Sequence, residues 1–109
     1  MKPIAWVGDS RERLREFPAD AKRDAGYQLE LVQAGSSPTA WKPMPSIGMG
    51  VNEIRVRAAG AFRVVYLAKF LEAVYVLHVF QKKSGKTSQA DIALARLRLR
   101  AVLAARRQT

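Results

Sequence analysis

The fold is decided by residues 53–86, which read EIRVRAAGAFRVVYLAKFLEAVYVLHVFQKKSGK. Three candidate strands follow one another at short spacing, at 52–58, 61–68 and 73–80. Ala59-Gly60 between the first two is typical of a tight hairpin turn. Basic residues punctuate the runs and continue just past the last one. The stretch therefore predicts a strand meander that carries fixed cations, as a protein needs in order to hold and strain a phosphodiester.

The alternation along these runs predicts which side chains share a face of the sheet. In the first run, a period of two separates Glu53, Arg55 and Arg57 from Ile54 and Val56. In the last run, the same period places His78 and Phe80 with Val74 and Val76, opposite Tyr75, Leu77 and Val79. Because the central runs are apolar on both sides, we expect both faces of the sheet to be covered.

Outside the meander, the sequence predicts one more strand and three helices. Residues 4–7 are apolar and end at Gly8, which indicates a strand. Asp9 can cap a short helix that Phe17-Pro18 breaks, and 19–34 form a second helix before Gly35. Residues 36–50 are turn-rich and predict an ordered surface loop. Ser88 with Asp91 opens a last helix that runs to about Arg107, with Ile92, Ala95, Leu99 and Val102 as its buried stripe.

The expected order is thus β-α-α-β-β-β-α. We expect one α+β domain over 1–109, because 109 residues suffice for a single core. Its small sheet is mainly antiparallel and has about four strands, with two N-terminal helices and a C-terminal helix.

Composition narrows the classes of partner. The net charge is +10, yet residues 1–54 hold seven basic and seven acidic side chains, so the excess lies wholly in 55–109. A one-sided basic field attracts polyanions. The chain has no cysteine and one histidine, so we expect neither a metal site nor a cofactor. It has no apolar run of membrane-spanning length and no signal-peptide core, which favours a cytoplasmic protein that binds no membrane.

Four segments together resemble a known family: GVNEIR at 50–55, GAFRVVY at 60–66, LHVFQKK at 77–83 and KT at 86–87. With the element order, they resemble the phage-derived, HigB-like branch of the RelE/ParE toxin superfamily over nearly the whole chain. The resemblance implies the toxin of a type II toxin–antitoxin system. Such toxins are mostly endoribonucleases that cut mRNA, often on the ribosome, and inhibit translation. The implied partner is an antitoxin encoded beside the toxin, frequently a helix-turn-helix protein.

Two other functions stay open at this point. The ParE side of the superfamily inhibits DNA gyrase without being an enzyme, so the fold alone does not fix the target. A catalytically inert, phage-derived protein that only binds nucleic acid has the same charge pattern. The set of cations around Arg55, Arg63 and Lys82 favours RNA cleavage over gyrase inhibition, and an adjacent gene for a helix-turn-helix protein would favour a toxin over the inert protein.

RNA cleavage of this kind needs no metal, only a base, an acid and cations that offset the developing charge. Arg55, Arg57 and Arg63 can grip the phosphate through bidentate hydrogen bonds. The resemblance implies basic residues of the site at Arg55 and Arg63, and at Lys82 or Lys83. Lys86 extends this track, because backbone contacts need several cations within reach.

The proton-transfer group is less well defined. His78 is the only side chain whose ordinary pKa lies near neutrality, which makes it the candidate acid or base. The alternative is a histidine packed in an apolar strand with one structural hydrogen bond. Relatives often complete the site with a tyrosine or histidine near the chain end, and the tail of this chain has neither. Phe80, beside the lysines, is a candidate platform for base stacking.

Overall fold

The meander forms as the sequence predicts. In the computed structural model, which describes residues 1–83 and 85–108, three consecutive antiparallel strands are β3 (Val51–Arg57), β4 (Ala61–Leu67) and β5 (Val74–Gln81). The turn between β3 and β4 contains Ala59 at φ 59° and Gly60 at φ 137°. Two consecutive residues with positive φ suit a tight hairpin, and Gly60 adopts a conformation that side chains disfavour.

Two short strands complete the sheet at its edges. β1 (Ile4–Trp6) pairs parallel with β5, and β2 (Trp41–Pro43) pairs antiparallel with β3, which gives the order β1-β5-β4-β3-β2. The α+β class and the mainly antiparallel sheet are confirmed. The sheet has five strands, where the sequence predicted about four. β2 was predicted as part of a loop because its three residues lie among turn-forming prolines, too few to show any alternation.

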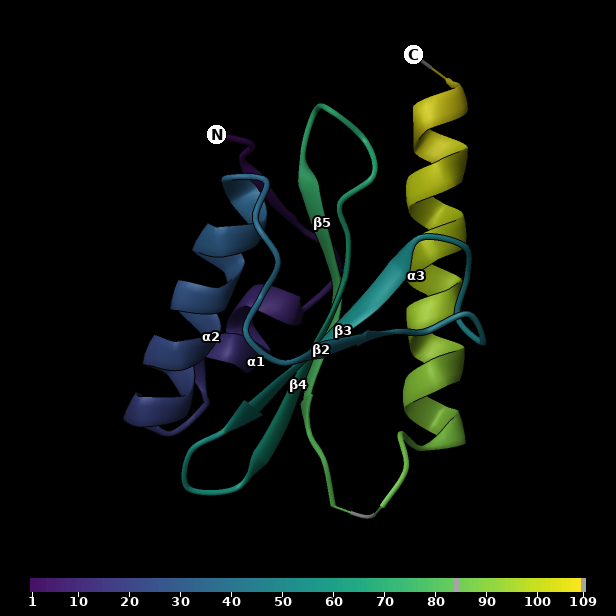
Figure 1. Cartoon of the computed structure of the whole chain (residues 1–109). Coiled ribbons are helices and arrows are strands. Elements are labelled where there is room, and N and C mark those ends of the chain that lie inside the picture. The colour runs from purple at the N-terminus through teal and green to yellow at the C-terminus, as the bar shows by residue number, and fades with distance from the viewer. Residues whose placement is uncertain (84, 109) are drawn as a thin grey trace.

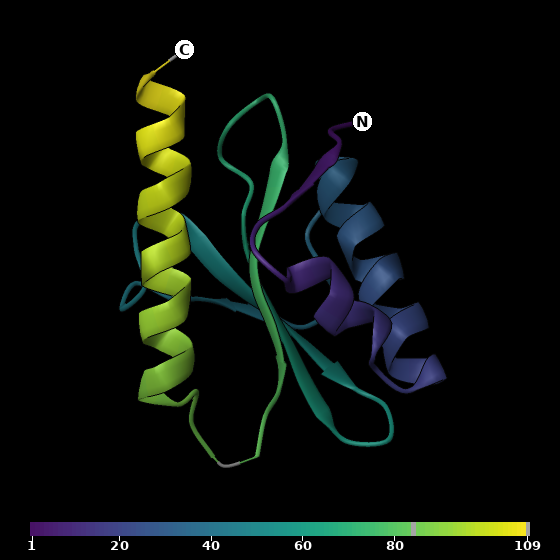
Figure 2. The same ribbon diagram turned by 180° about the vertical axis from the view of Figure 1, so that it is seen from behind.

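Helices cover both faces of the sheet (Figures 1 and 2). α1 (Ser10–Arg15) and α2 (Ala19–Gln33) lie on one face, and α3 (Gln89–Arg107) lies on the other. α3 begins as predicted, because the Ser88 hydroxyl accepts a hydrogen bond of 3.1 Å from the Asp91 amide. In the described residues, 1–83 and 85–108, we find no helix of the length and apolar character needed to cross a bilayer.

The predicted cap at Asp9 is wrong. Its carboxylate makes no capping hydrogen bond to α1 and instead binds Arg13 at 3.0 Å and Arg98 of α3 at 2.7 Å. The two guanidinium groups hold the pKa of Asp9 at about 2. Arg98 also donates to the carbonyl of Leu77 at 3.0 Å, so this side chain ties α1, β5 and α3 together.

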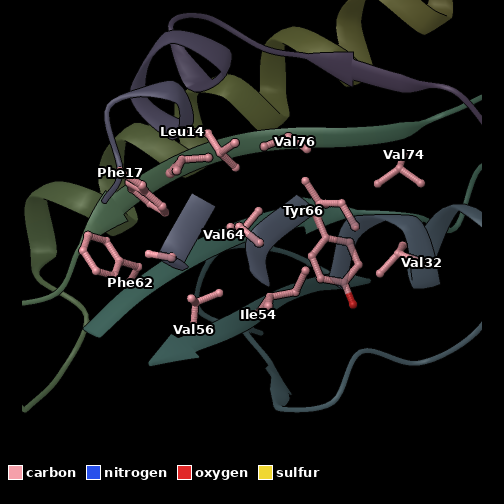
Figure 3. Close-up of a cluster of buried hydrophobic side chains, with 14 residues drawn as sticks. Leu14, Phe17, Val32, Ile54, Val56, Phe62, Val64, Tyr66, Val74 and Val76 are labelled. Carbon is pink, nitrogen blue, oxygen red and sulfur yellow. The ribbon is translucent and has the colours of Figure 1, made fainter. Parts of the chain in front are cut away.

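The two faces of the sheet carry different cores. The face under α1 and α2 buries an apolar cluster in which Leu14, Phe17, Ile54, Val64 and Val76 converge (Figure 3). The face under α3 buries the predicted stripe of that helix against β4 and β5. The buried side chains that carry or can gain a charge, Glu53, Arg63 and His78, all belong to strands, and their printed partners include Thr87 and Asp91 at the start of α3.

The predicted face of His78 is wrong, and a bulge is the reason. Val65 pairs with His78 while the next residue, Tyr66, pairs with Val76, so Leu77 is an extra residue in β5. Val74 and Val76 belong to the α1/α2 core together with Val79, whereas His78 bonds to α3. An extra residue in a strand reverses the alternation of faces beyond it. The bulge therefore places His78 and Phe80 on the α3 face, opposite to Val74 and Val76.

Candidate functional site

A buried ion pair lies at the centre of the candidate site. Arg63 on β4 is 3% exposed and Glu53 on β3 is fully buried, with Arg63 Nε 3.5 Å from Glu53 Oε1. Arg63 Nη1 donates to the carbonyl of Phe62 at 2.9 Å, and Thr87 donates to Glu53 Oε2 at 2.8 Å. Arg63 Nε and Glu53 Oε1 make no hydrogen bond in the described structure. The pair thus places a positive charge inside the fold, between β3 and β4.

Other cations surround this pair. Arg55 is the cross-strand neighbour of Arg63, and Lys82 follows β5, with its amide bonded to the carbonyl of Ala61 at 2.8 Å. Desolvation lowers the pKa of Lys82 from its ordinary value of 10.5, and the positive charges of Arg63, Arg55 and Lys42 lower it further, against the opposing effect of Glu53. A lysine with a lowered pKa exchanges protons more readily near neutral pH.

The pKa of Arg63 is also lowered, first by desolvation and then by the charges of Arg55 and Arg57, while Glu53 opposes the shift. Arg55 is half-buried and Arg57 is exposed. The structure therefore brings Arg55, Arg63 and Lys82 within electrostatic reach of one another, and an anion placed among them would relieve their mutual repulsion.

The predicted lysines line a hollow beside this cluster, which we call the lysine hollow. It measures about 230 Å³, and its walls are formed by Phe80, Gln81, Lys82, Lys83, Lys86, Ser88 and Asp91. Lys83 and Lys86 are exposed on the loop between β5 and α3, which we call the lysine loop. The hydrogen bond from Thr87 to Glu53 fastens that loop to the sheet. The loop lysines thus line the same hollow as Lys82, whose pKa responds to the charges of the buried pair.

His78 lies beneath this hollow and is covered. Its side chain is 2% exposed, its Nε2 is 2.7 Å from Asp91 Oδ1, and its ring stacks on Phe80 with centroids 4.9 Å apart. Burial lowers the pKa of His78, although the hydrogen bond to Asp91 opposes the shift. Ser88 donates to the other oxygen of Asp91 at 2.6 Å. In this geometry His78 connects β5 to the start of α3, and its role in proton transfer stays a prediction.

Two features of the site were missed from sequence. Thr87 fastens the loop that carries Lys83 and Lys86, and Asp91 binds His78. From the sequence, Thr87 was only the end of the family-like segment at 86–87, and Asp91 was only part of a helix cap. Glu53 was placed on the same face as Arg55, and an acid on a strand face among arginines is a signal for a buried pair. Within residues 1–83 and 85–108, no three histidine or acidic side chains converge as metal ligands do.

Comparison with known proteins gives one family. The sequence model of a family described as "Phage derived protein Gp49-like (DUF891)" matches residues 12–100. The matched range contains the whole meander, the lysine loop and the first part of α3. No curated protein matches the chain at a significant level.

Proposed function

The chain belongs to the phage-derived Gp49-like family, a toxin family of the RelE/ParE-like superfamily, and we propose from this premise that it cuts RNA as the toxin of a toxin–antitoxin pair. In this proposal it is a HigB-like, metal-independent endoribonuclease. It cleaves mRNA, on the ribosome or free, and so stops translation. Its partner is an antitoxin encoded beside it, of the helix-turn-helix kind.

One observation carries the proposal. Arg55, Arg63 and Lys82 come together on the sheet, and the hollow that Lys82 lines is also lined by the further cations Lys83 and Lys86. Cations fixed before the substrate arrives stabilise the charge that develops on a phosphorane without reorganisation. A gyrase inhibitor has no need of a cation held in place by a buried carboxylate.

The residues suggest how the reaction proceeds. The 2′-hydroxyl oxygen attacks the adjacent phosphorus, and its proton passes to the amine form of Lys82, which lines the hollow together with Lys83 and Lys86. The bond from phosphorus to the 5′-oxygen breaks, and that oxygen takes a proton from an ammonium group of the lysine loop. The products are a 2′,3′-cyclic phosphate and a 5′-hydroxyl. Arg55 binds the non-bridging oxygens, and Arg63 adds its positive field from below.

His78 is the second candidate for proton transfer in this proposal. To reach a nucleotide, its ring has to leave Asp91 and the face of Phe80. Phe80, which lines the lysine hollow, is the proposed stacking partner of a base. Replacing Lys82 and His78 separately distinguishes the two candidates, because only the group that transfers the proton should shift the pH dependence of kcat.

Mapping of RNA ends tests the proposed function. We expect new mRNA 5′-hydroxyl ends within minutes of inducing the wild-type chain without its antitoxin, and none with Lys82→Met or Arg55→Gln. Lys22→Gln is the matched control, because Lys22 is an exposed lysine on α2, outside the lysine hollow. Growth arrest without new RNA ends would overturn the nuclease proposal, and a DNA-damage response in its place would indicate gyrase.

A further inference from the structure

A second hollow lies on the other side of Arg55. It measures about 590 Å³ and is lined by Asp24, Tyr27, Gln28, Thr39, Ala40, Arg55 and Arg57. β2 pairs only with residues 52–54 of β3, and the Arg55 amide then donates to the carbonyl of Ala40 at 2.8 Å. Past this point, the edge of β3 borders the hollow rather than another strand. The hollow therefore lies between that edge and α2.

The wall on the β3 side suits an anion. Arg55 and Arg57 are the two basic residues that line it there. Arg55 Nε is enclosed and has no hydrogen-bond partner in the described structure. An enclosed guanidinium N–H is costly without an acceptor, and a phosphate oxygen is an acceptor that guanidinium groups bind well.

The wall on the α2 side suits a base instead. Tyr27 is 55% exposed, so its ring is free to stack. The carboxylate of Asp24 repels a phosphate but can accept a hydrogen bond from the exocyclic amino group of a base. The β3 side of the hollow thus suits a phosphate, and the α2 side suits a base.

The α2 wall is also fixed in place. Gln28, which is 4% exposed, donates to Asp24 Oδ1 and to Thr39 Oγ1, each at 3.1 Å. Its own Oε1 accepts from the Thr39 amide at 2.6 Å. Because the buried amide makes three hydrogen bonds, the wall is preformed, which lowers the cost of ordering it when a ligand binds.

We propose that this hollow is a nucleotide subsite for single-stranded RNA, with the phosphate on Arg55 and Arg57 and the base between Tyr27 and Asp24. The proposal rests on RNA being the substrate. Arg55 connects this hollow to the first site, because its charge acts on Arg63 and Lys82 and it is also one of the residues that line the second hollow. The nucleotide bound here is a neighbour of the one that is cut. Cytosine, adenine and guanine carry an exocyclic amino group that can donate a hydrogen bond to Asp24, and uracil does not.

Binding of uncleavable RNA tests the subsite. The probes are fluorescent hexamers of 2′-O-methylcytidine and 2′-O-methyluridine, in which the reactive hydroxyl is blocked. We expect Tyr27→Ala to weaken binding of the cytidine probe by about 10-fold, while Tyr27→Phe keeps it. Affinity falls as salt rises, and Arg57→Gln should make the negative slope of log affinity against log salt shallower by about 0.7, as expected when one phosphate contact to a single strand is lost. Asp24→Asn should reduce the preference for cytidine over uridine.

Arg23→Gln is the matched control, because it removes a charge from α2 at a residue that pairs with Asp20 outside the hollow. Unchanged probe binding in both Tyr27→Ala and Arg57→Gln would overturn the subsite, even if the wild-type chain cuts RNA. If those variants bind the probes normally and instead escape the antitoxin, the hollow is a protein-binding site and the proposal is wrong. If probe binding depends on Tyr27 and Arg57 but no RNA is cut, the subsite stands and the proposed nuclease activity falls.

Discussion

The two faces of the sheet bury very different side chains. Under α1 and α2, a cluster of apolar residues such as Leu29 and Ile54 fills the space, and the buried polar groups Ser10 and Gln28 are uncharged. Under α3, the sheet buries Glu53, Arg63 and His78 beside an apolar stripe. Buried charges are weak contributors to stability, because desolvation opposes their attraction. The comparison indicates that the first face supplies stability and that the second face gives up part of it to hold charged groups in fixed positions.

The largest expected effect comes from breaking the buried pair. Glu53→Gln leaves Arg63 buried and unpaired, and should lower the free energy of unfolding by about 3–5 kcal/mol in urea denaturation. Glu53→Leu together with Arg63→Met removes both charges, and should restore a stability close to that of the wild type. RNA cleavage should stay lost in the double variant. A double variant that remains as unstable as Glu53→Gln would contradict this view of the α3 face.

The other face should show the opposite pattern. Leu29 is 1% exposed, and Leu29→Ala should lower the free energy of unfolding by about 2–5 kcal/mol because it leaves a cavity. The folded fraction should keep the wild-type kcat and KM below the melting temperature, since Leu29 belongs to the α1/α2 core and lines neither hollow. A loss of kcat at full folding would show that the faces are not separable.

A smaller effect should follow from freeing the lysine loop. Thr87→Val removes the 2.8 Å hydrogen bond to buried Glu53 and should cost about 1–3 kcal/mol of unfolding free energy. Because Lys83 and Lys86 lie on the loop that this bond fastens, KM for RNA should rise more than kcat falls. Thr87→Ser, which keeps the hydroxyl, is the matched control and should behave as the wild type.

The mildest perturbation is pH. Burial lowers the pKa of His78 below its ordinary value of 6.5, so the unfolded chain binds more protons than the folded chain once the pH falls below about 6.5. The free energy of unfolding should therefore fall as pH drops through this range, by at most ~1.4 kcal/mol per pH unit. His78→Gln should remove this slope. Asp9 and Glu72, each with a pKa of about 2, contribute a further loss only below about pH 4.5.

Much of the fold followed from local patterns in the sequence. The hairpin at Ala59-Gly60, the cap at Ser88 and the stripe of α3 each depend on residues close in the chain, and all three are confirmed. β2 and the bulge at Leu77 depend on pairing between distant segments, and both were missed. The face of His78 was wrong for that reason.

The same distinction between local patterns and contacts of distant segments applies to the candidate site. The strand pattern together with the family resemblance singled out Arg55, Arg63 and Lys82 or Lys83, and the structure brings Arg55, Arg63 and Lys82 close together. The burial of Arg63 against Glu53, and the contact of Thr87 with that pair, join residues that lie far apart in the chain. No period or spacing encodes such contacts, so the sequence indicated which cations to consider but not how they are held, and their role in a reaction stays a prediction.

Cleavage of RNA by the purified chain tests the central claim most directly, that the cations at the α3 face form a nuclease site. A 5′-labelled single-stranded RNA is incubated in EDTA with the wild type, with Lys82→Met and with the control Lys22→Gln, each shown to be folded. We predict fragments that end in a 2′,3′-cyclic phosphate with the wild type and the control, and a loss of at least 100-fold in rate with Lys82→Met, within the roughly 10²–10⁴-fold that general acid–base catalysis contributes. Equal rates for Lys82→Met and the wild type would contradict the account.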